Sequence, residues 1–216
     1  GEVDVLVGTQ MIAKGHDFRR ITLVAAVQPD GALFSSDFRA PERLFSLLMQ
    51  AGGRAGRDAA VSAASEMWVQ TFHPTHPLYE ALRQHDYPAF AESQLRERER
   101  ASLPPFAHQA LLRAEARTQD AAQAFLADSR DAALAALQAD PALAPLAERV
   151  TVYPPVPMSL QRVADVERAQ MLLESPSRAA LQRFLAAWHP VLHATRQQPA
   201  HRALVRWAID VDPLAI

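Results

Sequence analysis

Cysteine is absent from the sequence, which excludes disulfide bonds and zinc sites built from thiolates. No apolar run approaches the roughly 18 residues of a membrane-spanning helix, and the first residues lack the pattern of a signal peptide. We therefore expect a cytoplasmic protein that has no membrane contact. Lysine occurs only at Lys14, so arginine supplies the other positive charges, a bias that we attribute first to codon composition. The net charge of −2 argues against a strongly basic, sequence-blind nucleic-acid binder.

The composition that remains is that of a globular protein. Hydrophobic residues make up 49% and charged residues 21% of the 216 residues, a length that suits one large domain or two small ones. The chain begins Gly1-Glu2-Val3 without a methionine, which predicts that it is a piece of a longer protein.

The first half of the chain alternates short apolar runs with stretches of helical spacing. Strands separated by helices indicate a parallel α/β sheet. Three strands are too few for a whole α/β domain, so we expect further strands upstream of this chain. The predicted elements are strands at 3–8, 21–27 and 66–72, a helix from Pro41 that ends at Gly52 and Gly53, and a mobile loop over 58–65.

The chain changes character at the two prolines that follow Leu103. Two helices, over 77–86 and 88–101, are expected before them. Proline cannot continue a helix and restricts the residue before it. We therefore place a domain boundary here, between domains at 1–103 and 104–216.

The second domain has the predicted element order β-α-β-β-α-β, which is the split βαβ motif of ferredoxin-like folds. We expect a compact sheet with two helices on one face. Ser177, behind Pro176, is the expected N-cap of the second helix. The predicted elements are strands at 107–116, 148–153, 167–175 and 203–212, helices at 119–138 and 177–195, and a loop of hairpin character at 154–165.

The stretch QAGGRAGR, from Gln50 to Arg57, places two arginines three residues apart, each preceded by a glycine. A guanidinium is a planar, permanently charged fork that fits phosphate oxygens, and glycine lets the backbone approach a ligand closely. Two such groups near a helix end can reach the same small anion. The alternative interpretation is a glycine-terminated helix with solvated arginines.

A second stretch, VGTQMIAKGHDF, ends a predicted strand at Gly8 and continues with the polar pair Thr9 and Gln10. Free backbone N–H groups at the start of a short helix there can hold a phosphate. Gly15 follows, and then the acid Asp17. The alternative is an ordinary strand-turn-helix corner with polar caps.

Together and in this order, the two stretches resemble motifs V and VI of superfamily 2 helicases. Residues 50–57 meet the pattern Q-x-x-G-R-x-G-R in full. Further stretches resemble the PriA family of replication-restart helicases, and they cover essentially the whole chain: GTQMIAKGHDF, DGALFSSDFRAPER, AGRAGR, HPTHPLYEAL, LPPF and VRWAIDVDP.

The resemblance implies an α/β fold in which part of a RecA-like helicase lobe is followed by a small α+β ferredoxin-like domain. It implies an enzyme that uses ATP and Mg²⁺ to translocate 3′ to 5′ along DNA at stalled forks. The motifs carry over as catalytic arginines at Arg54 and Arg57, ATP-binding residues at Gln50, Gly53, Gly15 and Asp17, and DNA-binding residues at Gly8, Thr9, Gln10 and Lys14.

The resemblance also implies partners, namely forked and single-stranded DNA, single-stranded-DNA-binding protein and other primosome proteins in the bacterial nucleoid. The pattern G-x-x-x-x-G-K-[ST] that binds ATP phosphates is absent, as are the family's zinc-binding cysteines. Both are expected upstream, so we expect zinc only there and no ATPase activity from this chain alone.

Arginines of the second domain are candidates for a DNA-binding face, although scattered surface arginines are an equally good interpretation. Segment 156–170 is less basic and aromatic than is usual in the family, which predicts a weaker contact with fork DNA there. The candidates are Arg113, Arg117, Arg202 and Arg206, with Arg196 near them.

Histidine and tryptophan are two further residue types that could bind a metal ion or a base. The pairs His73 and His76, and His189 and His193, have no carboxylate or thiol at matching spacing, so we expect no metal site. Tryptophans 188 and 207 fall in apolar patterns, which favours core packing over base stacking.

Three functions stay open on the sequence alone. The first is the motor of a replication-restart helicase. The second is a non-catalytic module that docks on branched DNA or on protein. The third is another superfamily 2 enzyme, such as a fork-regression translocase or an RNA helicase, because motif VI does not separate these.

Overall fold

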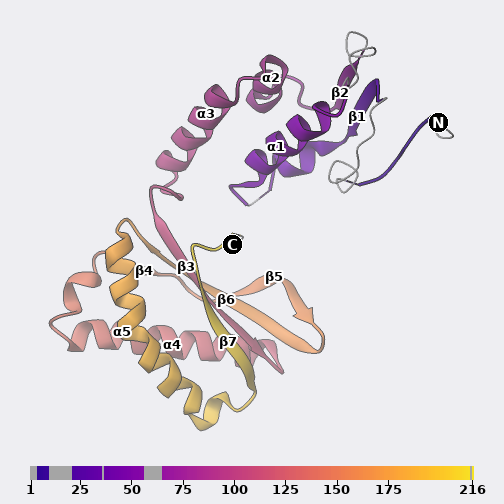
Figure 1. Cartoon of the computed structure of the whole chain (residues 1–216). Helices are drawn as coiled ribbons and strands as arrows, with labels where there is room; N and C mark the ends of the chain where they lie inside the picture. The colour runs from indigo at the N-terminus through magenta and orange to yellow at the C-terminus, as the bar shows by residue number, and fades with distance from the viewer. Residues whose placement is uncertain (1–3, 10–20, 36, 56–64, 215) are drawn as a thin grey trace. The chain divides into compact units, whose positions relative to one another are not determined.

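The computed structural model describes residues 4–9, 21–35, 37–55, 65–214 and 216. The chain has a mixed α/β architecture, as predicted, and divides into two compact units, Gly1–Glu97 and Arg98–Ile216 (Figure 1). The domain boundary between residues 103 and 104 stays a prediction. Within the described residues, no helix has the length and apolar character that would let it span a bilayer.

The first unit contains two parallel strands, in which Leu23 lies opposite Glu66 and Val27 opposite Gln70. A helix connects the strands, and two more helices follow the second strand (Figure 1). The elements are β1 (Leu23–Val27), η2 (Pro29–Ala32), α1 (Ala40–Gly52), β2 (Glu66–Gln70), α2 (Pro77–Gln84) and α3 (Tyr87–Arg100).

The core of the first unit forms where α1 meets α2 and the start of α3. Leu44, Phe45 and Leu48 are spaced to lie on one face of α1, and all three are buried. Phe45 stacks on Phe90, with ring centroids 4.6 Å apart. The strands predicted at 21–27 and 66–72 and the helix that ends at the glycines are confirmed, although each strand is two residues shorter than predicted.

The strand predicted at 3–8 is wrong for the residues that the structure describes. Residues 4–9 adopt no regular structure, and Val5 and Val7 are 76% and 87% exposed. A strand is held by the backbone hydrogen bonds of a neighbour, and no described residue pairs with this segment. This apolar run therefore has the composition of a strand, but no described strand pairs with it.

The second unit is built on a five-stranded antiparallel sheet. The strand order is β4-β6-β3-β7, and β5 pairs with β6. Its elements are β3 (His108–Ala116), α4 (Gln119–Ala139), η4 (Ala144–Leu146), β4 (Thr151–Val152), β5 (Val156–Val163), β6 (Val166–Ser175), α5 (Arg178–Gln197), η5 (Pro199–His201) and β7 (Leu204–Val211).

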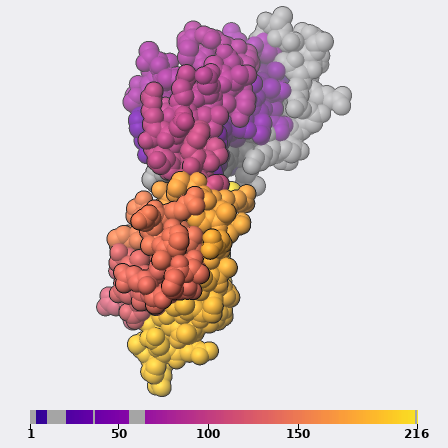
Figure 2. All heavy atoms as spheres, turned by 90° about the vertical axis from the view of Figure 1, so that its left-hand side faces the viewer, coloured from indigo at the N-terminus to yellow at the C-terminus, as the bar shows by residue number. Residues whose placement is uncertain are grey.

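Both long helices cover one face of this sheet. Alternate residues of the strands, such as Leu112 and Leu173, point toward the helices and share a core with Phe125 and Trp188. The two helices lie on the same side of the sheet in Figure 1, and in Figure 2 the salmon and the orange to yellow parts of the chain adjoin on the surface that faces the viewer. Trp188 donates a hydrogen bond from Nε1 to the carbonyl of Ser129 at 2.9 Å, so its packing in the core, predicted above, is confirmed.

Local sequence signals start the helices of this unit. The hydroxyl of Ser177 accepts a hydrogen bond from the N–H of Ala180 at 3.3 Å, which confirms the predicted N-cap. Thr118 caps α4 in the same way through the N–H of Ala121. Side-chain oxygens at these positions satisfy N–H groups that the helix itself leaves unpaired.

The segment 154–165, predicted as a loop of hairpin character, contains strand β5, which forms a hairpin with β6. The turn consists of Ala164 and Asp165, both with positive φ. The pairs that β5 forms with β6 lie at its two ends, and most of its side chains are exposed. Its apolar residues alternate at Val156, Met158 and Leu160, but the prolines at 154, 155 and 157 favour a loop over a strand. The strand predicted at 148–153 shrinks to Thr151–Val152.

Candidate functional site

Helix α1 carries polar side chains along the face opposite its buried one. Arg43, Ser46 and Gln50 lie there, at spacings of three and four residues. Gln50 donates from Nε2 to the hydroxyl of Ser46 at 3.3 Å. These side chains, together with Tyr87 from the start of α3, line an open groove within the first unit.

Helix α1 ends in a tight glycine turn that leads directly into Arg54. A Cβ atom on Gly52 would lie 2.7 Å from the sulfur of Met67 in β2, so a larger residue would have to displace that flexible side chain. The N–H of Gly53 donates to the carbonyl of Met49 at 2.9 Å, and the N–H of Arg54 to that of Ala51 at 3.0 Å. The backbone of Arg54 is thereby fixed against the end of the helix.

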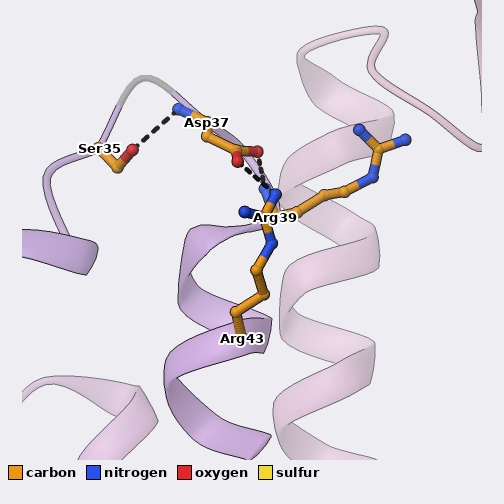
Figure 3. Close-up of polar contacts among 4 residues, drawn as sticks. All are labelled: Ser35, Asp37, Arg39 and Arg43. Carbon is orange, nitrogen blue, oxygen red and sulfur yellow. Dashed lines mark hydrogen bonds and ion pairs between the residues drawn. The ribbon is translucent and has the colours of Figure 1, made fainter. Parts of the chain in front are cut away.

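The loop before α1 is held by Asp37 (Figure 3). Its carboxylate accepts a hydrogen bond from the N–H of Arg39 at 2.9 Å and forms a short ion pair with the guanidinium of Arg43. The N–H of Asp37 donates to the hydroxyl of Ser35 at 3.1 Å. A carboxylate at a helix N-terminus is favourable because it opposes the positive end of the helix dipole.

The side chain of Arg39 points away from this network in Figure 3. Its guanidinium carbon lies 4.3 Å from the centre of the Phe38 ring. A cation over an aromatic face gains electrostatic attraction from the ring. Asp37 therefore orders the side chain of Arg43 in α1, while Phe38 lies against the guanidinium of Arg39.

Asp30 joins three segments at the carboxyl ends of the parallel strands. Its carboxylate accepts hydrogen bonds from the Thr71 hydroxyl at 2.5 Å, the Phe72 N–H at 2.8 Å and the Tyr79 hydroxyl at 2.8 Å. The bond from Thr71, followed by that from Phe72, lowers the pKa of Asp30. Burial, and then the bond to Asp30, raise the pKa of Tyr79 to about 12. The sequence interpretation missed this site.

Two histidines follow β2. His76 caps α2, because its Nδ1 accepts a hydrogen bond from the N–H of Leu78 at 3.2 Å, and burial lowers its pKa. His73 packs edge-on against Phe34 with ring centroids 4.8 Å apart. The described residues contain no group of three or more potential metal ligands.

Two candidate arginines of the second unit are paired with acids. Arg206 forms a bidentate contact with Glu115 at 2.8 and 2.9 Å, and Arg113 lies 3.1 Å from Asp210. The bond from Arg206, helped by the charges of Arg206 and Arg168, lowers the pKa of Glu115, and the same pair raises the pKa of Arg206. The sequence suggested these arginines from their type alone and did not reveal the acids that partly neutralise them.

The other two candidate arginines are exposed at the corner where β3 ends and β7 begins. The N–H of Arg117 donates to the carbonyl of Ala203, next to Arg202. Neither side chain has an ion-pair partner among the residues that the structure describes. Arg196 differs, because its guanidinium donates to the carbonyls of His201 and Leu204 at 3.2 and 2.8 Å and so closes the same corner.

Trp207 is half-buried at the edge of the core. The rings of His189 and His193 lie 4.7 Å apart and pack edge-on against Trp207 at 5.8 and 5.1 Å. The i,i+4 histidine pair thus forms part of an aromatic cluster. The prediction that Trp207 packs against the core is confirmed.

The predicted site residues fall into three groups. Gln50, Gly53 and Arg54 come together at the end of α1, and Gly8 and Thr9 lie exposed in irregular chain. Their assigned roles stay predictions. The following predicted residues lie outside the described part of the chain: Gln10, Lys14, Gly15, Asp17, Gly56 and Arg57.

Comparison with known proteins identifies the family. Residues 99–214 match the model of the primosomal protein N C-terminal domain. The chain is 39% identical over 217 residues to replication restart protein PriA of Haemophilus influenzae. This alignment covers 99% of the chain and 27% of that protein. The chain belongs to the PriA family. PriA of Synechocystis sp. is 34% identical over 218 residues, and PriA of Treponema pallidum is 37% identical over 216 residues. The chain covers 24% and 30% of their lengths, so it spans less than a third of these relatives.

Proposed function

We propose that the chain is part of an ATP-dependent DNA helicase that moves 3′ to 5′ and initiates primosome assembly at stalled replication forks. The relatives are named for replication restart. The main support from the geometry is the tight turn that fixes Arg54 at the end of α1, beside Gln50. The complete pattern Q-x-x-G-R-x-G-R begins at this Gln50.

The residues at this end of α1 fit the phosphates of ATP, because an amide and a guanidinium both donate hydrogen bonds to oxygen. ATP would supply a γ-phosphoryl group whose oxygens gain negative charge during transfer. Arg54, with Arg57, would stabilise that charge from a second lobe, an effect on the order of 10³ to 10⁵ in rate. Gln50, Gly53, Gly15 and Asp17 would line the same cleft. We expect Mg²⁺ and the remaining phosphate ligands to be held upstream, and zinc as well.

We also propose a fold for each of the two units. We take the first unit as the end of a RecA-like lobe, since β1 and β2 are parallel and joined through a helix. We take the second unit as a ferredoxin-like domain with β5 added, since its sheet order β4-β6-β3-β7 with two helices on one face agrees with a split βαβ arrangement.

We propose forked and single-stranded DNA as ligands, and single-stranded-DNA-binding protein and other primosome proteins as partners, in the bacterial nucleoid. Gly8, Thr9, Gln10 and Lys14 would contact the DNA backbone in the first unit. In the second unit, the exposed corner of Arg117 and Arg202 is the best candidate for a phosphate contact. Arg113 and Arg206 are weaker candidates because acids hold them.

The ATP-site proposal is tested by Arg54→Ala in the full-length protein. DNA-dependent ATP hydrolysis should fall by roughly 10³ or more in kcat. Arg83→Ala is a matched control, since Arg83 is an exposed arginine of α2 that pairs with Glu80 one turn earlier. Arg57→Ala should behave like Arg54→Ala. Unchanged ATPase activity in both motif variants would exclude the assignment.

A second candidate function is a docking module for branched DNA, favoured by the complete core of the second unit. The measurement is fluorescence anisotropy of this chain with a labelled three-way fork and with a linear duplex of equal length, across a salt series. Tighter binding to the fork with a shallow salt slope supports an independent module. No binding, or equal and steeply salt-dependent binding, assigns fork recognition to other parts of the protein.

A further inference from the structure

The sheet face opposite the helices carries a row of alternating charges across three strands. Glu115 of β3 lies directly opposite Arg206 of β7 on one side and Arg168 of β6 on the other. Its neighbours Ala114 and Ala116 point into the helical core, so Glu115 points to the other face. One carboxylate thus stands between two guanidinium groups.

The two arginines are held differently. Arg206 makes the bidentate contact with Glu115, yet its side chain is 72% exposed. Arg168 is 23% exposed, and its buried Nε lies 3.7 Å from the carboxylate without making a hydrogen bond. Glu115 itself is 16% exposed. A largely buried acid therefore neutralises one surface cation and attracts a second, less accessible one.

The row matters more for surface charge than for folding. An ion pair with so exposed an arginine contributes little to stability, because water screens it and the long side chain loses freedom. The ion pair has a larger effect on the electrostatic potential of the sheet face, since an arginine that an acid neutralises no longer adds a full positive charge there. Binding to DNA depends on the number of phosphates that such charges neutralise.

We propose that Glu115 restrains DNA binding by the second unit, because it holds Arg206, and secondarily Arg168, away from backbone phosphates. The ligand class is the DNA phosphodiester backbone, and the proposal rests on the proposed contact between this unit and DNA. The exposed corner of Arg117 and Arg202 binds first. The sheet face adds its contacts only where a phosphate displaces the Glu115 carboxylate. The restraint lowers sequence-independent affinity for plain duplex.

Glu115→Gln tests the restraint in the 216-residue chain, because it removes the charge and keeps the size and one acceptor oxygen. We expect duplex affinity, measured by anisotropy with a labelled duplex, to rise about fivefold to tenfold near 0.1 M salt, with a salt slope steeper by about one unit. Circular dichroism and urea unfolding of the variant check that it folds.

Glu174→Gln is the matched control. Glu174 lies on the same sheet face and accepts a hydrogen bond from Gln109 at 3.0 Å, and none of the described arginines forms an ion pair with it. It loses the same charge, so any gain that it shows measures net charge alone. The gain of Glu115→Gln should exceed it several-fold. Adding Arg206→Ala to Glu115→Gln should cancel most of that excess.

Arg206→Ala alone gives a test that does not depend on the folding of a Glu115 variant. The proposal predicts that Arg206→Ala lowers duplex affinity by no more than Glu174→Gln raises it, because Glu115 already holds Arg206. A direct phosphate contact of Arg206 predicts a loss several-fold larger. Equal binding by Glu115→Gln and Glu174→Gln overturns the restraint and leaves the DNA contact standing. Binding by neither wild type nor Glu115→Gln, even near 50 mM salt, overturns the proposed DNA contact as well.

Discussion

The two units differ in how completely they bury their apolar surface. Among the described residues, the core of the second unit has 22 buried members and that of the first has eight, so only the second encloses its sheet face with two long helices. In the first unit, one face of the pair β1 and β2 packs against the core and the other is exposed. On the exposed face, Trp68 is 59% and Val27 is 70% exposed.

This difference follows from the type of sheet. Parallel strands usually have both faces covered, whereas an antiparallel sheet can leave one face to solvent. The antiparallel sheet of the second unit uses that freedom for its row of charges. Among the described residues, the parallel pair of the first unit has one face on which Val27 and Trp68 are exposed. Since PriA relatives are more than three times longer, we expect further parts of the protein to cover it.

Separating the units should give the largest effect. Residues 98–216 alone should give a dispersed amide spectrum and a cooperative urea transition, because their core lies wholly within them. Residues 1–97 alone should give neither, since a small core and an uncovered sheet offset little of the chain entropy. Nuclear magnetic resonance and urea unfolding make both measurements. Cooperative folding of residues 1–97 would contradict the comparison.

Trp188→Ala should give the next largest effect. It leaves a cavity beneath α5 and removes the hydrogen bond that Trp188 donates to the carbonyl of Ser129, and we expect a loss of about 3–5 kcal/mol in the free energy of unfolding. Trp68→Ala in the first unit is the control, because its side chain is mostly exposed. Urea unfolding followed by circular dichroism compares them. A similar loss for both would show that exposure in this chain does not report on packing.

Ser177→Ala should cost about 1 kcal/mol, because the N–H of Ala180 loses its acceptor at the start of α5. The effect should appear only in the unfolding transition of the second unit. Ser159→Ala, in the exposed strand β5, removes the same hydroxyl without a helix cap and should change little. Equal losses would argue that the cap adds nothing to α5.

Asp30→Asn should have its smallest effect at the lowest pH. The folded state lowers the pKa of Asp30 below its usual 3.8. The stability that the carboxylate adds is therefore present above the unfolded pKa and is lost as the pH falls through the folded pKa. Below pH 3.8 the first unit of the wild type should weaken, and Asp30→Asn should flatten that dependence. Urea titrations followed by Trp68 fluorescence, with the other tryptophans replaced by phenylalanine, measure it. An unchanged pH slope contradicts the role of Asp30.

Elements that are set by local rules could be predicted from the sequence. Helix α5 follows from the cap at Ser177 and a long apolar period, and the end of α1 follows from its two glycines. Elements that depend on a distant neighbour could not. The segment 4–8 has the composition of a strand but no described partner. Strand β5 has a partner in β6, but the prolines at 154, 155 and 157 favour a loop as long as that partner is unknown.

The candidate site shows the same limit. Residue types and spacing identified Gln50, Gly53 and Arg54, which the structure brings together at one helix end. Asp30 and Glu115 were missed because their partners lie far along the chain, 41 residues away for Thr71 and 91 for Arg206. Pairing of this kind is a property of the fold. A sequence shows which groups carry charge, and the fold decides which charges are still available to a ligand.

The turn between β5 and β6 bears on how the sequence can change over evolutionary time. Ala164 and Asp165 have φ angles of 47° and 64°, and two-residue hairpin turns of this kind favour asparagine and glycine. Alanine in this conformation is strained by roughly 1–2 kcal/mol. Mutational drift toward Asn-Gly would therefore stabilise the hairpin without touching the core or the charged face. Relief of this strain would raise the free energy of unfolding and could offset destabilising substitutions elsewhere in the second unit.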